Sequence, residues 1–132
     1  RGMSATIQEW LLAAEYVLAA GNSQVVLCER GIRTFETMTR NTLDLAGAVM
    51  AKQHTHLPVI VDPSHGVGVA SAVPALARAT AVTGLDGVMI EVHPSPQAAL
   101  SDGHQALDPP VFTRLVAEIT ELQSRWPLGA GK

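Results

Sequence analysis

The stretch LPVIVDPSHGVG, at residues 57–68, decides the fold of this chain. Its first half, residues 57–62, is a short apolar run rich in valine and isoleucine that ends at Pro63, which predicts a buried strand. Similar apolar runs occur at residues 24–29 and 87–92. Intervals of roughly 30 residues are typical of strands that alternate with helices in a parallel sheet.

Four helices are expected around these strands, at residues 4–20, 41–54, 70–83 and 110–125. Apolar residues recur in each segment at helical spacing. Ser4 and Asn41 are candidates to cap the first two helices, and Pro74 is tolerated in the third only because it falls in the first turn. The order of helices and strands predicts the α/β class.

Two architectures fit that order. A doubly wound sheet usually carries a glycine-rich phosphate turn after its first strand, and none follows Glu29. A (β/α)8 TIM barrel carries its chemistry in the loops after the strands, and charged or polar residues follow all three strands here. We favour the barrel.

Three strands cannot close a barrel, which needs about eight strand–helix units and roughly 250 residues. We therefore expect the chain to be the C-terminal half of a (β/α)8 barrel, with parallel strands alternating with helices. Residues 1–125 would belong to that single domain, and residues 126–132 would form a tail.

The composition favours strands that are covered on both faces, since 47% of the residues are apolar and only 16% are charged. The formal net charge of -3 gives no general attraction for nucleic acid or an anionic membrane. The apolar runs are too short to span a membrane, and no secretory signal opens the chain. We expect a cytoplasmic protein with neither nucleic acid nor membrane as a partner.

Three potential metal ligands follow the second and third strands. His65, Glu91 and Asp102 offer one imidazole and two carboxylates, a donor set suited to Mn, Fe, Co or Zn. Taken alone, each residue also has an ordinary explanation: a hydrogen-bonded loop histidine, an ion pair with an arginine, or a turn aspartate before glycine. The spacing leaves both interpretations open.

Arg30 ends the first strand beside a glycine, where a guanidinium can hold phosphate or carboxylate with paired hydrogen bonds. The alternative for Arg30 is a surface ion pair with Glu29 or Glu36, and for Arg33 and Arg40 we prefer such surface pairing. Cys28, the single cysteine, is interpreted as a small core residue. His54 and His56 precede the second strand and are expected to be exposed, at the end of the sheet opposite the chemistry.

Four motifs together resemble the 3-deoxy-7-phosphoheptulonate (DAHP) synthases, in the branch related to 3-deoxy-octulosonate 8-phosphate synthase. They are CERGIRTFE at 28–36, TRNTLD at 39–44, LPVIVDPSHGVG at 57–68 and MIEVHPSPQAALSDGHQALD at 89–108. The resemblance implies a (β/α)8 barrel enzyme, a transferase that condenses phosphoenolpyruvate with erythrose 4-phosphate in the first step of the shikimate pathway. It also implies a homo-oligomer for the full-length protein.

The resemblance assigns roles to five residues. His65, Glu91 and Asp102 correspond to the family's ligands for a divalent metal, which could be Mn, Fe, Co or Zn. Arg30 corresponds to the arginine that contacts phosphoenolpyruvate, and Asp62 to a residue near the metal and the aldehyde substrate. His65, Arg30 and Asp62 are the predicted catalytic residues.

The chain also departs from the family pattern. The family's fourth metal ligand, a cysteine on the first barrel strand, and its lysine and arginine motif for both substrates have no counterpart in these 132 residues. We therefore expect this stretch alone to be inactive. The alternatives are a 3-deoxy-octulosonate 8-phosphate synthase and a non-catalytic fragment or interaction module.

Overall fold

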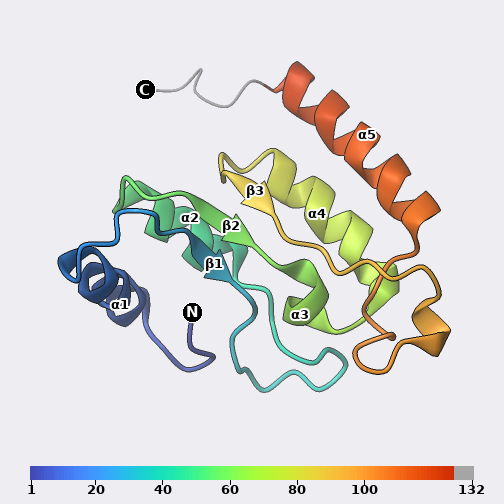
Figure 1. Cartoon of the computed structure of the whole chain (residues 1–132), viewed down its shortest axis with the longest axis horizontal. Helices are drawn as coiled ribbons and strands as arrows, with labels where there is room; N and C mark the ends of the chain where they lie inside the picture. The colour runs from blue at the N-terminus through green and yellow to red at the C-terminus, as the bar shows by residue number, and fades with distance from the viewer. Residues whose placement is uncertain (127–132) are drawn as a thin grey trace.

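A computed structural model describes residues 1–126 of the chain, and a three-stranded parallel sheet lies at its centre (Figure 1). The strands are β1 (Leu27–Glu29), β2 (Val59–Val61) and β3 (Gly87–Val88), in the order β1-β2-β3. Leu27 pairs with Val59, and Val61 pairs with Val88. The sequence-based expectation of an α/β fold with parallel strands alternating with helices is confirmed.

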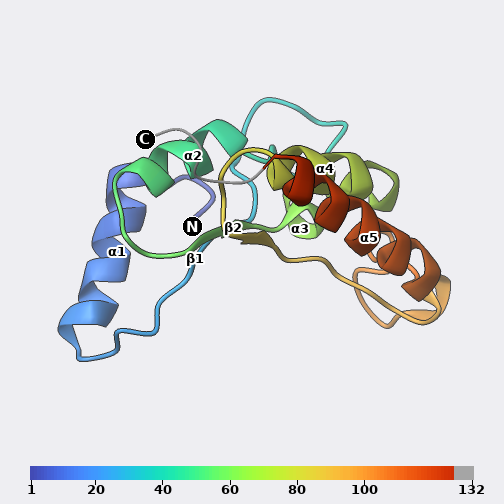
Figure 2. The same ribbon diagram turned by 90° about the horizontal axis from the view of Figure 1, so that it is seen from above.

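Helical segments precede, connect and follow the strands. They are α1 (Ile7–Ala19), α2 (Leu45–Gln53), α3 (Pro63–Val67), the 3-10 helix η1 (Ala70–Ala72), α4 (Val73–Ala81), the 3-10 helix η2 (Pro96–Ala98) and α5 (Pro109–Arg125). α1 and α5 lie at opposite ends of the molecule in both views (Figures 1 and 2). Within residues 1–126, no helix combines the length and the apolar character that crossing a bilayer requires.

Helices cover one face of the sheet. α2 packs on β2, α4 packs on β3, and Figure 2 shows both helices on the same side of the strands. Side chains of a strand alternate between faces, and Leu27, Val59 and Val61 are buried while Cys28 and Ile60 between them are partly exposed. Leu27, Val59 and Val61 therefore face the helices.

The core has two clusters. One joins α1, α2 and the first two strands through Trp10, Ala48, Ala51, Val59 and neighbouring residues. The other joins α4 and α5 through buried aliphatic side chains. Burial of apolar surface at about 25 cal/mol per Å² is the main force that holds both helix pairs to the sheet.

Two predicted helix caps were wrong. α1 is capped by Thr6, not Ser4, because Thr6 and Glu9 form a reciprocal capping box that satisfies two backbone N–H groups. α2 is capped by Asp44, not Asn41, since the Asp44 carboxylate accepts from the Gly47 N–H at 2.7 Å.

The segments after β2 and β3 also differ from expectation. Pro63 does not simply end the strand; it starts the short helix α3, for which Asp62 is the cap and where proline loses no hydrogen bond. The predicted helix at residues 70–83 begins as η1 and continues as α4. β3 is shorter than residues 87–92, and Val92 instead forms an isolated parallel bridge with Leu107.

Asp86 lies directly before β3 and connects this strand to β2 and α2. Its carboxylate accepts from the Val59 N–H at 2.6 Å and pairs with Lys52 at 2.8 Å. Partial burial acts to raise the pKa of Asp86, but the hydrogen bonds from Lys52 and Val59 outweigh it and place that pKa below its ordinary value of 3.8.

Replacing Asp86 by alanine should lower the free energy of unfolding by about 1 kcal/mol at pH 7, because the Val59 N–H loses its partner. A carboxylate with a depressed folded-state pKa stabilises the fold above its unfolded pKa and stops doing so as the pH falls through the folded value. The difference between the two proteins should therefore shrink below about pH 4 in urea titrations. Glu15→Ala, which removes an exposed carboxylate of α1, is the control, and a pH-independent effect of Asp86→Ala would contradict the argument.

Candidate active site

Polar side chains from three strand ends meet at the carboxyl edge of the sheet. Arg30 follows β1, Asp62 and His65 follow β2, and Glu91 comes after β3. Because the strands are parallel, the segments that follow them leave the sheet at the same edge. His65 is the middle residue of the short helix α3.

Asp62 is the buried centre of this edge, with a side chain only 1% exposed. One carboxylate oxygen accepts from the His65 backbone N–H at 2.9 Å. The other lies 2.8 Å from His65 Nδ1 and accepts from Arg30 Nε at 3.1 Å. Asp62 therefore sets the orientation of both the histidine and the arginine.

His65, Glu91 and Asp102 lie close enough to share one cation. Each offers a ligand atom, and these atoms all lie within 4.8 Å of one another. His65 Nε2 is 3.7 Å from Glu91 Oε2, while the other ring nitrogen faces Asp62. A histidine that binds metal through one nitrogen commonly has a carboxylate on the other. The donor set and this outer contact fit a divalent metal.

Glu91 is held from two sides by residues that the sequence analysis did not identify. Its backbone N–H donates to the buried Ser64 hydroxyl at 3.0 Å. Its carboxylate accepts from the Gln105 amide at 2.7 Å. Ser64 lies inside the DPSH motif at residues 62–65, so the sequence could have indicated that it belongs to the site. No local sequence pattern marks Gln105.

Asp102 adopts a left-handed backbone conformation, with φ of 56°, which few non-glycine residues tolerate and which often occurs at functional sites. The next residue, Gly103, is packed so tightly that a Cβ there would lie 2.1 Å from the Pro96 carbonyl oxygen. Arg40 Nη1 donates to the Asp102 carboxylate at 3.3 Å. Arg40 is half-exposed and forms an ion pair, as the sequence analysis expects. Its partner, however, is the candidate metal ligand Asp102 and not Glu29 or Glu36.

A pocket of about 350 Å³ lies beside this cluster. It is lined by Arg1, Met3, Arg30, Gly31, Arg33, Arg40, Asn41 and His65. Four of the lining residues are arginines, and the Arg1 guanidinium is itself buried and paired with Asp44. The remaining arginines favour an anion, since phosphate and carboxylate are the groups that arginine binds best. His65 lines this pocket and also belongs to the candidate metal cluster, so the two sites are adjacent.

The wall of that pocket depends on Glu29, which is fully buried at the end of β1. Burial raises the pKa of Glu29, but its carboxylate accepts from the Gly31 N–H at 2.8 Å and from the Asp44 N–H at 3.2 Å. Gly31 has φ of 95° and no room for a Cβ, which would lie 2.7 Å from Asn41 Cβ. This turn directs Arg30 away from the strand; the predicted alternative, an Arg30–Glu29 ion pair, does not occur.

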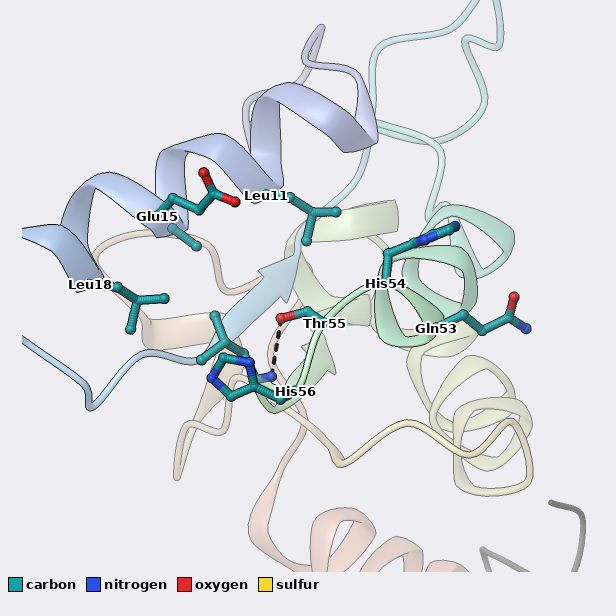
Figure 3. A pocket seen from close by; sticks show the side chains of 9 residues that line it. Leu11, Glu15, Leu18, Gln53, His54, Thr55 and His56 are labelled. Carbon is teal, nitrogen blue, oxygen red and sulfur yellow. Dashed lines mark hydrogen bonds between the residues drawn. The ribbon is translucent and has the colours of Figure 1, made fainter.

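A larger cavity lies elsewhere. It measures about 660 Å³ and is formed by α1 and the segment before β2, at the opposite end of the sheet (Figure 3). His54 and His56 are exposed there as predicted, and the Thr55 hydroxyl accepts from the Leu57 N–H. None of the predicted site residues lines it, so size alone does not identify the active site.

Comparisons with known proteins agree with the sequence motifs. The profile of the DAHP synthetase I family matches residues 1–126. A phospho-2-dehydro-3-deoxyheptonate aldolase of Thermotoga maritima is 50% identical over 122 residues, which make up 92% of this chain and 36% of that protein. A 2-dehydro-3-deoxyphosphooctonate aldolase of Thioalkalivibrio sulfidiphilus is 35% identical over an alignment of 116 residues, and the match covers 78% of this chain and 40% of that protein.

The fold is similar to that of a solved relative. A truncated form of 3-deoxy-D-arabino-heptulosonate 7-phosphate synthase from Thermotoga maritima superimposes with a TM-score of 0.92 and is 49% identical in sequence. The match covers 95% of this chain and 48% of that one. The chain therefore spans less than half the length of these relatives.

Cys28 is predicted to be unreactive. Burial, with a smaller contribution from Asp62, raises the pKa of the Cys28 thiol from 9.0 to about 11. A shift of this size reduces the thiolate at pH 8 about 100-fold, and because a thiolate of higher pKa is also more nucleophilic, alkylation should be slower by about 10-fold or more. Mass-spectrometric mapping of iodoacetamide labelling would measure the rate, with the same protein unfolded in urea as control. Equal rates in both states would show that the thiol is accessible and ionised.

Proposed function

The chain belongs to the DAHP synthetase I family, and from this membership we propose that the protein containing it condenses phosphoenolpyruvate with erythrose 4-phosphate. The products are 3-deoxy-D-arabino-heptulosonate 7-phosphate and inorganic phosphate. The observation that carries the proposal is the Arg30–Asp62–His65 contact, which joins an arginine-lined pocket to a three-residue metal-type cluster. An enzyme that joins two phosphorylated substrates needs both features side by side.

Arg30 is proposed to hold phosphoenolpyruvate. Its Nε is engaged by Asp62, which leaves the Nη groups to bind the phosphate or carboxylate of the substrate. Paired hydrogen bonds from a fixed guanidinium would orient the methylene carbon and offset the charge that keeps two phosphorylated molecules apart.

His65, Glu91 and Asp102 are proposed to hold a divalent metal, which could be Mn, Fe, Co or Zn. When bound, such an ion would supply a Lewis acid that polarises the aldehyde oxygen of the second substrate. The Asp62 carboxylate is proposed to accept a hydrogen bond from His65 Nδ1 and so to hold the imidazole ring in place. In that tautomer Nε2 carries no proton and can bind the metal.

The overall reaction forms one carbon–carbon bond and one carbon–oxygen bond to water, and it breaks the carbon–oxygen bond to phosphate. The methylene carbon of phosphoenolpyruvate adds to the aldehyde carbon, and the aldehyde oxygen becomes a hydroxyl group by gaining a proton. Water adds to the carbon that bears the phosphate, and inorganic phosphate leaves as the ketone forms. The role proposed for this chain is to bind and orient both reactants.

The whole protein is proposed to be a cytoplasmic homo-oligomer. Its substrates carry phosphate groups, which keep such molecules inside the compartment where they are made. Phe35 and Met38, in the loop after β1, are 96% and 88% exposed, and exposed apolar residues of this size are common where another chain docks. The stretch of 132 residues alone, with three strands among its described residues, is expected to show no turnover.

Replacing His65 by alanine in the whole protein should remove bound metal and reduce consumption of phosphoenolpyruvate by more than about 100-fold, because losing a ligand costs several kcal/mol of transition-state stabilisation. Metal content and phosphate release would be measured together. His56→Ala, at the opposite end of the sheet, is the matched control and should behave as the unsubstituted protein. Full activity of His65→Ala would end the assignment.

Replacing Arg30 by alanine should raise KM for phosphoenolpyruvate about 10- to 100-fold, the loss expected for one charged hydrogen-bonding group. KM for erythrose 4-phosphate should change much less. Arg78, which pairs with Glu118 on α5, provides the control substitution Arg78→Ala. An unchanged KM for phosphoenolpyruvate in Arg30→Ala would remove Arg30 from the substrate pocket.

A second candidate is the condensation of phosphoenolpyruvate with arabinose 5-phosphate. The octulosonate aldolases among the relatives favour it, but their identities of 32% to 37% are lower than the 50% of the heptonate enzyme. Assays of the whole protein with the two aldose phosphates in parallel would decide between them. The proposal expects kcat/KM to be higher with erythrose 4-phosphate.

A further inference from the structure

Gln105 lies in an environment that the proposed reaction does not by itself explain. Its side chain is fully buried, at 0% exposure. The amide Nε2 donates to Glu91 Oε2 at 2.7 Å, and Oε1 accepts from Arg40 Nη1 at 3.2 Å. Burying an amide is costly unless both ends are hydrogen-bonded, and here both partners belong to the candidate active site.

The backbone brings Gln105 to this position. The Leu107 N–H donates to the Glu91 carbonyl at 2.9 Å, and the His93 N–H donates to the Leu107 carbonyl at 2.9 Å. The segment that contains Gln105 therefore runs beside the segment that contains Glu91. In addition, the Gln105 N–H donates to the Asp102 carbonyl at 3.0 Å and closes the turn that carries the third ligand candidate.

Arg40 extends the contact to the second carboxylate. The same Nη1 atom that donates to Gln105 also donates to Asp102 Oδ1 at 3.3 Å. The Glu91 oxygen that accepts from Gln105, Oε2, is also the one that lies 3.7 Å from His65 Nε2. One amide thus restrains Glu91 directly and Asp102 through an arginine.

We propose that Gln105 is a positioning residue that orders the two carboxylates of the metal site before the metal binds. The inference rests on the proposed function, because it assigns Gln105 to that same site. An amide suits the role since it donates at one end and accepts at the other. A glutamate there would place a second negative charge 2.7 Å from Glu91, and like charges that close repel.

Binding of Co²⁺ to the metal-free whole protein tests the proposal. Gln105→Leu should weaken Co²⁺ binding about 10- to 100-fold in calorimetric titrations, the usual cost of losing an outer contact to a ligand. It should also change the visible absorption of the bound Co²⁺, which reports ligand geometry. Gln105→Met keeps the length of the side chain, removes both hydrogen bonds and should weaken binding as well, so the test survives if the leucine variant does not fold.

A double substitution separates positioning from general packing. Because Gln105 holds Glu91 directly, Gln105→Leu should weaken Co²⁺ binding less in a Glu91→Ala background than in the unsubstituted protein. Thr80→Val is the matched control, because Thr80 is a buried polar residue whose hydroxyl bonds only within α4; it should change stability but not Co²⁺ affinity.

The outcomes distinguish this inference from the function it rests on. Equal Co²⁺ affinity in Gln105→Leu and the unsubstituted protein would overturn the role of Gln105 and leave the metal site intact. Equal additional weakening in the Glu91→Ala background would also overturn it. Failure of the unsubstituted protein to bind Co²⁺ would overturn the metal site itself, and the role of Gln105 with it.

Discussion

One buried carboxylate, that of Asp62, is the constraint on which the rest of the site depends. It caps α3, lies within hydrogen-bond distance of His65 Nδ1 and accepts a hydrogen bond from Arg30 Nε. An unpartnered charge at 1% exposure would be strongly unfavourable, so these contacts are needed for Asp62 to be buried at all. The same contacts connect the end of β1 to the end of β2. Stability and site geometry therefore rest on the same hydrogen bonds.

The sheet gives Asp62 this position through the alternation of its strands. Val59 and Val61 face the helices and are completely buried, whereas Ile60 between them lies on the other, partly exposed face. Asp62 comes directly after Val61, where its backbone N–H still pairs with the Glu29 carbonyl at 2.8 Å. The apolar residues of β2 thus end at Val61, and the polar residues of the site begin with Asp62.

Features carried by local patterns were predictable from the sequence, and features that depend on distant contacts were not. The strands followed from apolar spacing. That spacing left the role of His65, Glu91 and Asp102 open, and the resemblance to the DAHP synthase motifs favoured a metal site. The capping box of Thr6 was visible in its spacing to Glu9 and was overlooked. Gln105 carried no such signal, since its role arises only where residues 105–107 pair alongside residues 91–93.

Arg30 contacts Asp62, and Arg40 contacts Asp102. These two contacts explain how one region can bind anions and a cation side by side. The chain carries a net charge of -3, yet Arg1, Arg30, Arg33 and Arg40 gather in one pocket. Arg30 contacts Asp62 through Nε alone, so its Nη donors remain for an anion. A lysine offers one compact ammonium group and could not divide its donors between two directions in this way. The guanidinium therefore lets an acidic cluster and an arginine-lined pocket lie directly beside each other.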